Sequence, residues 1–129
     1  MDELTKEKQR IASVYDERLC PVDGAFSIPG RRPDSTHVFH QYVIRTRDAA
    51  TRTKLIDHLN KLDIGTIIHY PVPPHLQEAY AYLGHAKGDF PITELYADTV
   101  LSIPMYNGMT DQEQDAVIRA LNDFRPDHP

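Results

Sequence analysis

Segment 65–75 holds the residues of this sequence best suited to contact a ligand. It reads Gly-Thr-Ile-Ile-His-Tyr-Pro-Val-Pro-Pro-His, so an apolar run ends at His69 and Tyr70, and His75 follows a proline-rich turn. Imidazole and phenol groups donate hydrogen bonds to anions and hydroxyl groups, and prolines limit the ordering entropy that is lost on binding. The residues alone leave two interpretations open: a ligand-contacting loop at a strand end, or a polar loop edge where prolines end the strand.

Other patterns that would indicate a reactive centre are absent from the sequence. His37 and His40 are three residues apart on a predicted strand, so their side chains leave opposite faces. No Cys-x-x-Cys, His-Glu-x-x-His or Gly-x-Ser-x-Gly pattern occurs, and there is no glycine-rich phosphate loop. Cys20 is the only cysteine, so no internal disulfide can form. We therefore expect neither a metal site nor a catalytic residue.

Charge and apolar patterning disfavour several classes of protein. The chain has 129 residues, with 14 basic and 19 acidic side chains and a net charge of −5, so its surface repels nucleic-acid phosphates on average. No apolar run approaches the roughly 18 residues of a membrane span, and the amino-terminal residues lack a signal-peptide pattern. We expect one cytoplasmic domain with no nucleic-acid and no membrane partner. A small nucleic-acid-binding α+β domain remains a less favoured hypothesis.

Helical and alternating patterns of apolar residues interleave along the chain. The expected helices cover 3–19, 48–62, 75–83, 93–99 and the segment from Thr110 to Pro126. The expected strands cover 37–46, 65–70 and 100–103, and 21–36 is expected to be a surface loop. This order predicts the α+β class, with a small three-stranded sheet covered by helices on one face. The other face would remain free for another domain.

Three local signals fix the ends of these helices. Asp48 is a good N-cap for the helix that follows it, and Asp63 stands where a left-handed turn would end that helix. Thr110 and Glu113 form a capping box, in which each side chain accepts a hydrogen bond from the other residue's backbone N–H. These signals place the strand that leads to His69 directly after a helix end.

A series of motifs spans nearly the whole chain in one order. Arg10-Ile11-Ala12 with Tyr15-Asp16 comes first, followed by 37–45, 65–77, 79–80, 88–91, 101–106 and 108–111. Together these motifs resemble the C-terminal domain of the DegT/StrS-type sugar aminotransferases, which are pyridoxal-phosphate enzymes of fold type I. Two positions depart from the family pattern: Asp63 stands where glycine is expected, and Asn107 where proline is usual.

The resemblance implies a domain layout and a function. Residues 1–20 would form the helix that links two domains, 21–36 a loop and 37–129 the small α+β domain, as in fold-type-I aminotransferases. The large domain that binds pyridoxal phosphate would lie outside this chain. The whole enzyme would transfer an amino group to a nucleotide-linked keto sugar, in amino-sugar or polysaccharide biosynthesis.

The lysines of the chain bear on what it does alone. All five lie on predicted helices or in a polar loop, and none has the desolvated or cation-flanked surroundings that lower the pKa of a Schiff-base lysine. We therefore expect the chain alone to bind no pyridoxal phosphate and to be catalytically inactive.

The resemblance also assigns site residues. His69 and Tyr70 would contact the diphosphate or the sugar of the nucleotide-sugar substrate, and His75 is a weaker candidate for such a contact. All three would position the substrate and would take no part in the chemistry. The alternative is a free-standing, non-catalytic binding or assembly module that reuses this domain.

A domain that packs against a missing partner should expose an apolar surface. The first helix carries Ile11, Tyr15 and Leu19 at helical spacing, and we expect part of that surface along these residues. Exposed apolar patches promote self-association, so a homo-oligomer is expected.

Overall fold

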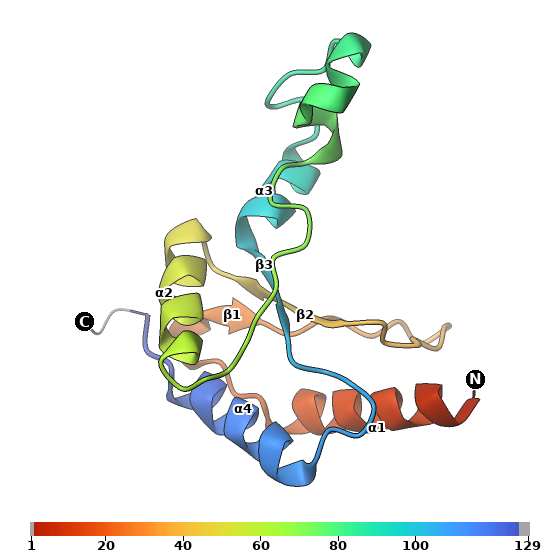
Figure 1. Cartoon of the computed structure of the whole chain (residues 1–129), viewed down its shortest axis with the longest axis vertical. Helices are drawn as coiled ribbons and strands as arrows, with labels where there is room; N and C mark the ends of the chain where they lie inside the picture. Colours follow the sequence, from red (N-terminus) through yellow and green to blue (C-terminus); the bar gives the residue numbers. More distant parts are fainter. Residues whose placement is uncertain (1, 127–129) are drawn as a thin grey trace.

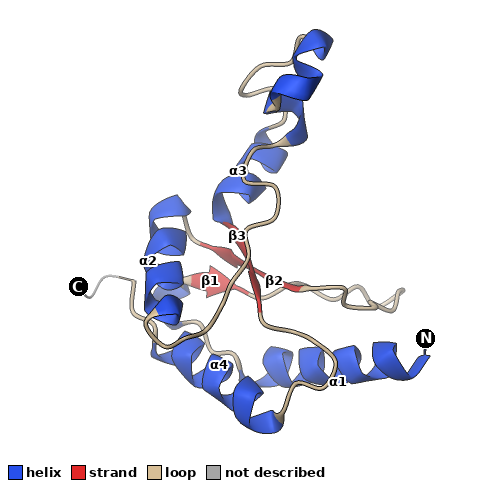
Figure 2. Cartoon of the chain, viewed as in Figure 1, coloured by secondary structure: helices blue, strands red, loops and turns tan. Residues whose placement is uncertain are grey.

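Three antiparallel strands form the centre of the fold (Figure 2). The structure is a computed structural model and describes residues 2–126. Strand β1 covers Phe26–Ser27, β2 covers Tyr42–Thr46 and β3 covers Val100–Ile103, in the order β1-β2-β3. Tyr42 lies opposite Ile103 and Ile44 lies opposite Leu101. Because side chains alternate along a strand, these four point to the same face of the sheet.

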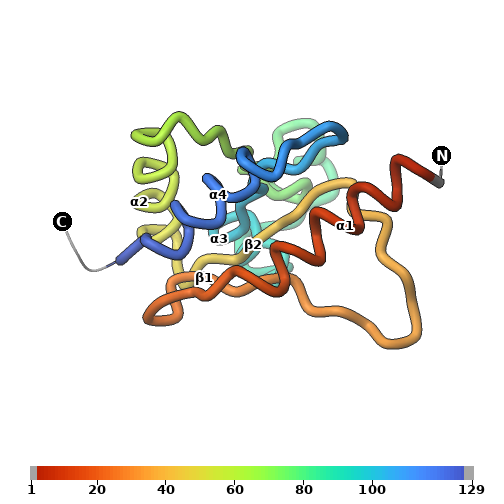
Figure 3. The backbone as a smooth tube through the Cα atoms, turned by 90° about the horizontal axis from the view of Figure 1, so that it is seen from below, coloured from red at the N-terminus to blue at the C-terminus, as the bar shows by residue number. Residues whose placement is uncertain are grey.

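Helices cover one face of this sheet and extend beyond its end (Figure 1). The α-helices are α1 (Asp2–Arg18), α2 (Ala49–Asn60), α3 (Pro91–Thr99) and α4 (Asp111–Asp123). The 3₁₀ helices are η1 (Val22–Gly24), η2 (Pro74–Leu76) and η3 (Glu78–Leu83). Seen from below, α1 and α4 pass in front of the strands (Figure 3). Residues 70–99, which include η2, η3 and α3, extend away from the sheet and are called the projecting lobe.

The core lies between the sheet and helices α1, α2 and α4. Tyr42, Ile44 and Thr46 of β2 are buried, whereas Arg45 between them is exposed. The buried helical side chains on the inner face include Ile11, Tyr15, Leu55, Leu59, Val117, Ile118 and Leu121. Burying one such apolar side chain contributes about 1.5–3 kcal/mol, so this cluster is the main source of stability.

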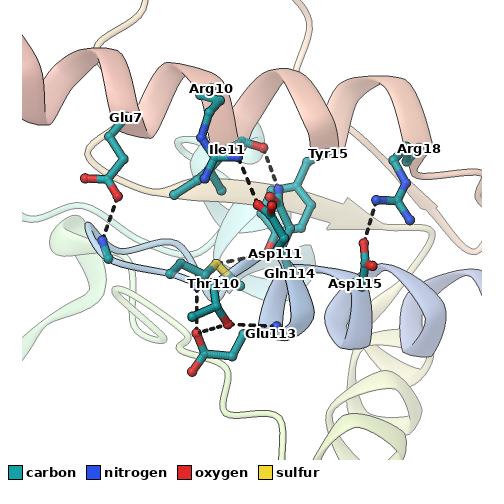
Figure 4. Close-up of polar contacts among 12 residues, drawn as sticks. Glu7, Arg10, Ile11, Tyr15, Arg18, Thr110, Asp111, Glu113, Gln114 and Asp115 are labelled. Carbon is teal, nitrogen blue, oxygen red and sulfur yellow. Dashed lines mark hydrogen bonds and ion pairs between the residues drawn. The ribbon is translucent and has the colours of Figure 1, made fainter.

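Two buried polar groups join α1 to the carboxyl-terminal part of the chain (Figure 4). The fully buried side chain of Gln114 donates from Nε2 to the carbonyl oxygen of Ile11 at 2.8 Å. Tyr15 donates its hydroxyl to the carbonyl oxygen of Pro104 at 2.7 Å. Burial, and secondarily the nearby Tyr106, raises the pKa of Tyr15, so this hydroxyl keeps its proton and remains a donor.

Most of the expected elements are confirmed. Helices α1, α2 and α4, strand β3 and the α+β class with helices on one face agree with the apolar patterns. Asp48 caps α2 by accepting a hydrogen bond from the Thr51 N–H at 2.7 Å. Asp63 has a φ of 56°, as a left-handed helix end requires. Thr110 and Glu113 form the capping box of α4.

The predicted strand 37–46 is wrong in its first half. Only Tyr42–Thr46 pair with neighbouring strands. Phe39 is buried and has a φ of 52°, a left-handed conformation outside the β region. The alternating pattern therefore ends at that residue, and the segment before β2 is a loop.

Two further corrections concern which segment joins the sheet. The predicted strand 65–70 is reduced to a single bridge, in which Ile67 pairs with Ser102. The predicted loop 21–36 instead contains η1 and β1, and β1 pairs with β2. A strand of two residues is too short to give an alternating pattern, which explains why the sequence did not reveal it.

The helix expected over 75–83 is also wrong in type. It consists of η2 and η3, because Gln77 between them is extended with a ψ of 140°. Gly84 ends η3 with a φ of 73°, a left-handed conformation that costs glycine little.

The expected apolar surface on the first helix is wrong. Ile11 and Tyr15 are fully buried and Leu19 is 5% exposed, because they pack in the core of this chain. Large apolar side chains are exposed mainly in the projecting lobe, where Tyr82 is 80% and Ile92 is 69% exposed.

Candidate functional site

A groove of about 660 Å³ lies between the segment after α2 and the segment after β3. Its walls include 62–67, His69, 102–106 and part of α4. The lining is mainly apolar, and its polar side chains include those of Gln41, Asp63, His69, Ser102 and Glu113. Small-molecule sites commonly measure about 300–1,000 Å³ and combine apolar walls with a few polar groups, so the groove is a candidate ligand site.

His69 lies between this groove and a smaller hollow. The smaller hollow has a volume of about 290 Å³ and a mainly apolar wall that includes Tyr70 and Tyr96. His69 belongs to the walls of both. The backbone two residues before it is fixed to β3, because Ile67 and Ser102 exchange two backbone hydrogen bonds. Its imidazole is therefore carried by a segment that the sheet holds in place.

Tyr70 has a strained backbone that its own packing does not explain. Its φ is 57° and its side chain is 72% exposed. A bulky residue in the left-handed region is a genuine outlier, and the following Pro71 further disfavours α-type conformations. Such strain costs about 1–3 kcal/mol and concentrates at ligand sites. The strain favours the ligand-contacting interpretation of this loop over a simple polar edge.

Replacing Tyr70 with glycine is expected to raise the free energy of unfolding by about 1 kcal/mol, because glycine adopts positive φ without strain. Tyr70→Ala should give no such gain, since alanine keeps the Cβ that causes the strain. Asp63→Gly is the matched control at another positive φ, and its gain should be smaller because aspartate tolerates this region. Urea denaturation measures all three, and a Tyr70→Gly variant less stable than Tyr70→Ala would contradict the strain.

His75 is not brought together with His69 and Tyr70. Its Nε2 lies 3.0 Å from Oε1 of Glu94, and the two side chains are only 8% and 14% exposed. The same Oε1 accepts a hydrogen bond from the Gly88 N–H at 2.7 Å, and this bond, followed by that of His75, holds the pKa of Glu94 below its usual value. His75 therefore joins parts of the projecting lobe and borders neither hollow.

Two further features bear on residues 2–126. No helix there combines the length and the apolar character needed to cross a membrane. That same part of the chain contains no group of three or more His, Cys, Asp or Glu side chains placed to hold a metal ion.

Comparison with known proteins places the chain in a family. The sequence profile of the DegT/DnrJ/EryC1/StrS aminotransferase family matches residues 1–122. The chain belongs to this family. The fold agrees: the crystal structure of DesV from S. venezuelae superposes with a TM-score of 0.85 at 32% identity, covering 94% of this chain and 32% of that one.

Curated relatives match along almost the whole chain. A pleiotropic regulatory protein of Geobacillus stearothermophilus is 33% identical over 125 residues, which are 96% of this chain and 33% of the relative. A dTDP-3-amino-3,4,6-trideoxy-α-D-glucose transaminase of Streptomyces venezuelae is 32% identical over 124 residues, or 96% of this chain and 32% of the relative. The chain thus spans about a third of the length of these relatives.

The groove does not by itself fit pyridoxal phosphate, on which aminotransferases of this family depend. The cofactor needs a lysine amine for its Schiff base, and the residues that line the groove include neither lysine nor arginine. Lys8 and Lys54 instead donate to the backbone carbonyl oxygens of His40 and Pro126, at 3.1 and 2.7 Å. The residues that line the groove therefore supply no amine for the Schiff base.

Two polar residues of the groove were missed by sequence reasoning. The side chain of Gln41 contacts His69, with Nε2 of the amide 3.4 Å from Nδ1 of the imidazole. Ser102 lines the groove, and its buried Oγ has no hydrogen-bond partner within residues 2–126. A glutamine before a strand and a serine within one carry no signal of their own, so only the folded arrangement identifies them.

Proposed function

We propose that this chain is the C-terminal small domain of a pyridoxal-phosphate-dependent aminotransferase that acts on nucleotide-linked keto sugars in the cytoplasm. The observation that carries the proposal is the family match over residues 1–122, together with the fold similarity to DesV. The names of three relatives support the substrate class, since they are transaminases of dTDP- or UDP-linked sugars. The pathway would be amino-sugar or polysaccharide biosynthesis.

Within such an enzyme, the residues of this chain would bind and orient the substrate. His69 and Tyr70 lie on adjacent positions beside the two hollows, and both can donate hydrogen bonds to a diphosphate or a sugar hydroxyl. His75 is a weaker third candidate, because its Nε2 is already engaged by Glu94. Pyridoxal phosphate and its lysine would belong to a large domain outside this chain.

A free-standing binding or assembly module without catalysis is the second candidate function. Helices α1, α2 and α4 and the sheet enclose a core within this chain, and this supports the second candidate. For both candidates we propose a homo-oligomer, supported by the exposed apolar side chains of the projecting lobe.

The experiment begins with the coding sequence upstream of this chain. We expect an in-frame region that encodes a lysine-bearing domain, and the complete protein with pyridoxal phosphate should form a coloured Schiff base. With an amino-acid donor and dTDP- or UDP-linked keto sugars, mass spectrometry should detect an amino sugar, whereas the 129-residue chain alone should give neither result. Colour with the chain alone would contradict the proposed division of labour. A closed upstream reading frame would favour the second candidate.

A further inference from the structure

The backbone that carries Gln41 is fixed to its surroundings. Gln41 directly precedes β2, and the turn before it is closed because the Phe39 N–H donates to Nδ1 of His37 at 2.9 Å. Gln9 of α1 donates from its side chain to the carbonyl oxygen of His37 at 3.0 Å. The half-buried side chain of Gln41 is therefore held by a fixed backbone at the wall of the groove.

From that point the amide of Gln41 reaches the imidazole of His69. The nitrogen of the amide, Nε2, lies 3.4 Å from Nδ1 of His69. With the amide in this orientation its nitrogen donates and does not accept, so Nδ1 accepts this hydrogen bond and carries no proton. In a neutral imidazole the proton then resides on Nε2. His69 consequently offers a ligand an N–H donor.

We propose that Gln41 is a positioning residue that fixes the tautomer and the ring orientation of His69, so that the Nε2–H donates to an acceptor oxygen of the ligand. Assigning that oxygen to the substrate rests on the proposed function. A phosphate oxygen suits a fixed N–H donor better than a hydroxyl does, because a charged acceptor makes the stronger hydrogen bond. In this proposal a diphosphate oxygen of the substrate is the acceptor for His69.

The test is long-range ¹H–¹⁵N NMR of His69 in the 129-residue chain, which needs neither substrate nor cofactor. Spectra are recorded at alkaline pH, where histidine side chains are neutral. In the unaltered protein, the proton is expected on Nε2 and not on Nδ1. In Gln41→Glu the carboxylate can only accept, so the proton is expected to move to Nδ1.

Two controls accompany this variant. Gln77→Leu removes a side-chain hydrogen bond of the same kind, from Nε2 to the Val72 carbonyl oxygen at 3.0 Å, without touching His69. The tautomer of His69 should stay unchanged in it. His58 is an internal reference in every spectrum, because its Nε2 lies 2.9 Å from the Ala120 carbonyl oxygen and must donate.

Three outcomes overturn the proposal: a proton on Nδ1 of His69 in the unaltered protein, a proton still on Nε2 in Gln41→Glu, or a changed His69 tautomer in Gln77→Leu. If Gln41→Glu does not fold, Gln41→Leu replaces it. Both tautomers are then expected, and an unchanged Nε2–H tautomer overturns the proposal. Failure of the proposed function is distinguishable, because it would remove the effect of His69 on substrate KM and leave the tautomer result standing.

Discussion

Replacing Tyr15 with alanine is expected to lower the free energy of unfolding by about 3–5 kcal/mol, the range for truncating a buried aromatic ring. Tyr15 is fully buried, its ring centroid lies 5.0 Å from that of Tyr42, and its hydroxyl donates to the Pro104 carbonyl oxygen. The substitution would leave a cavity between α1 and β2. It would also remove the hydrogen bond that holds Pro104, which lines the groove. Urea denaturation followed by circular dichroism measures the change.

Two variants separate the contributions of this residue. Tyr15→Phe keeps the ring and removes only the hydrogen bond, so a loss of about 1 kcal/mol is expected. Leu4→Ala on the same helix should change stability by less than about 0.5 kcal/mol, because Leu4 is 55% exposed. If α1 were instead a docking face, Tyr15→Ala would alter self-association at nearly unchanged stability, and that result would contradict the buried position.

Helices α1, which carries Tyr15, and α4 show which features the sequence predicts well. Periodicity located both helices, and the capping box of Thr110 and Glu113 located the start of α4. Periodicity shows that one face of a helix is apolar but does not show what covers it. In α1 the apolar face packs within the chain, so the expected docking surface was placed on the wrong element.

Phe39 illustrates the opposite limit, where tertiary contacts override a local pattern. Its alternating neighbours predicted a strand, but the backbone turns left-handed and the ring is buried. The guanidinium of Arg31 lies 4.1 Å from the ring centroid, and Arg31 is itself paired with Asp16 of α1 at 2.7 Å. A cation over an aromatic face is attractive. Neither Arg31 nor Asp16 is adjacent to Phe39 in the sequence, so no local pattern reveals this arrangement.

The candidate site divides in the same way. His69 and Tyr70 were identified because their types and the prolines after them are visible in sequence. Gln41 was not, since it contacts His69 across 28 positions. The resemblance made His75 a weaker candidate for a ligand contact, and in the structure its Nε2 is engaged by Glu94, which is 19 positions away. Contacts over such separations depend on the fold and leave no local pattern.

His69→Ala in the complete protein is expected to raise the KM for the nucleotide sugar by about 10- to 100-fold and to change kcat far less. A hydrogen bond to a charged group contributes about 1.5–3 kcal/mol, and each 1.4 kcal/mol is a factor of ten in affinity. A positioning residue binds the ground state and the transition state equally well. Its loss therefore raises KM and leaves kcat nearly unchanged. Steady-state kinetics with a dTDP- or UDP-linked keto sugar measures both constants.

The control for this prediction is His85→Ala. His85 is a partly exposed histidine of the projecting lobe, and its Nδ1 lies 3.4 Å from a carboxylate oxygen of Asp89. It lines neither the groove nor the smaller hollow, so its removal should leave KM unchanged. A His69→Ala variant with a reduced kcat and an unaltered KM would instead place His69 in the chemical step. That pattern would reject substrate positioning, because it arises when an interaction is made only in the transition state.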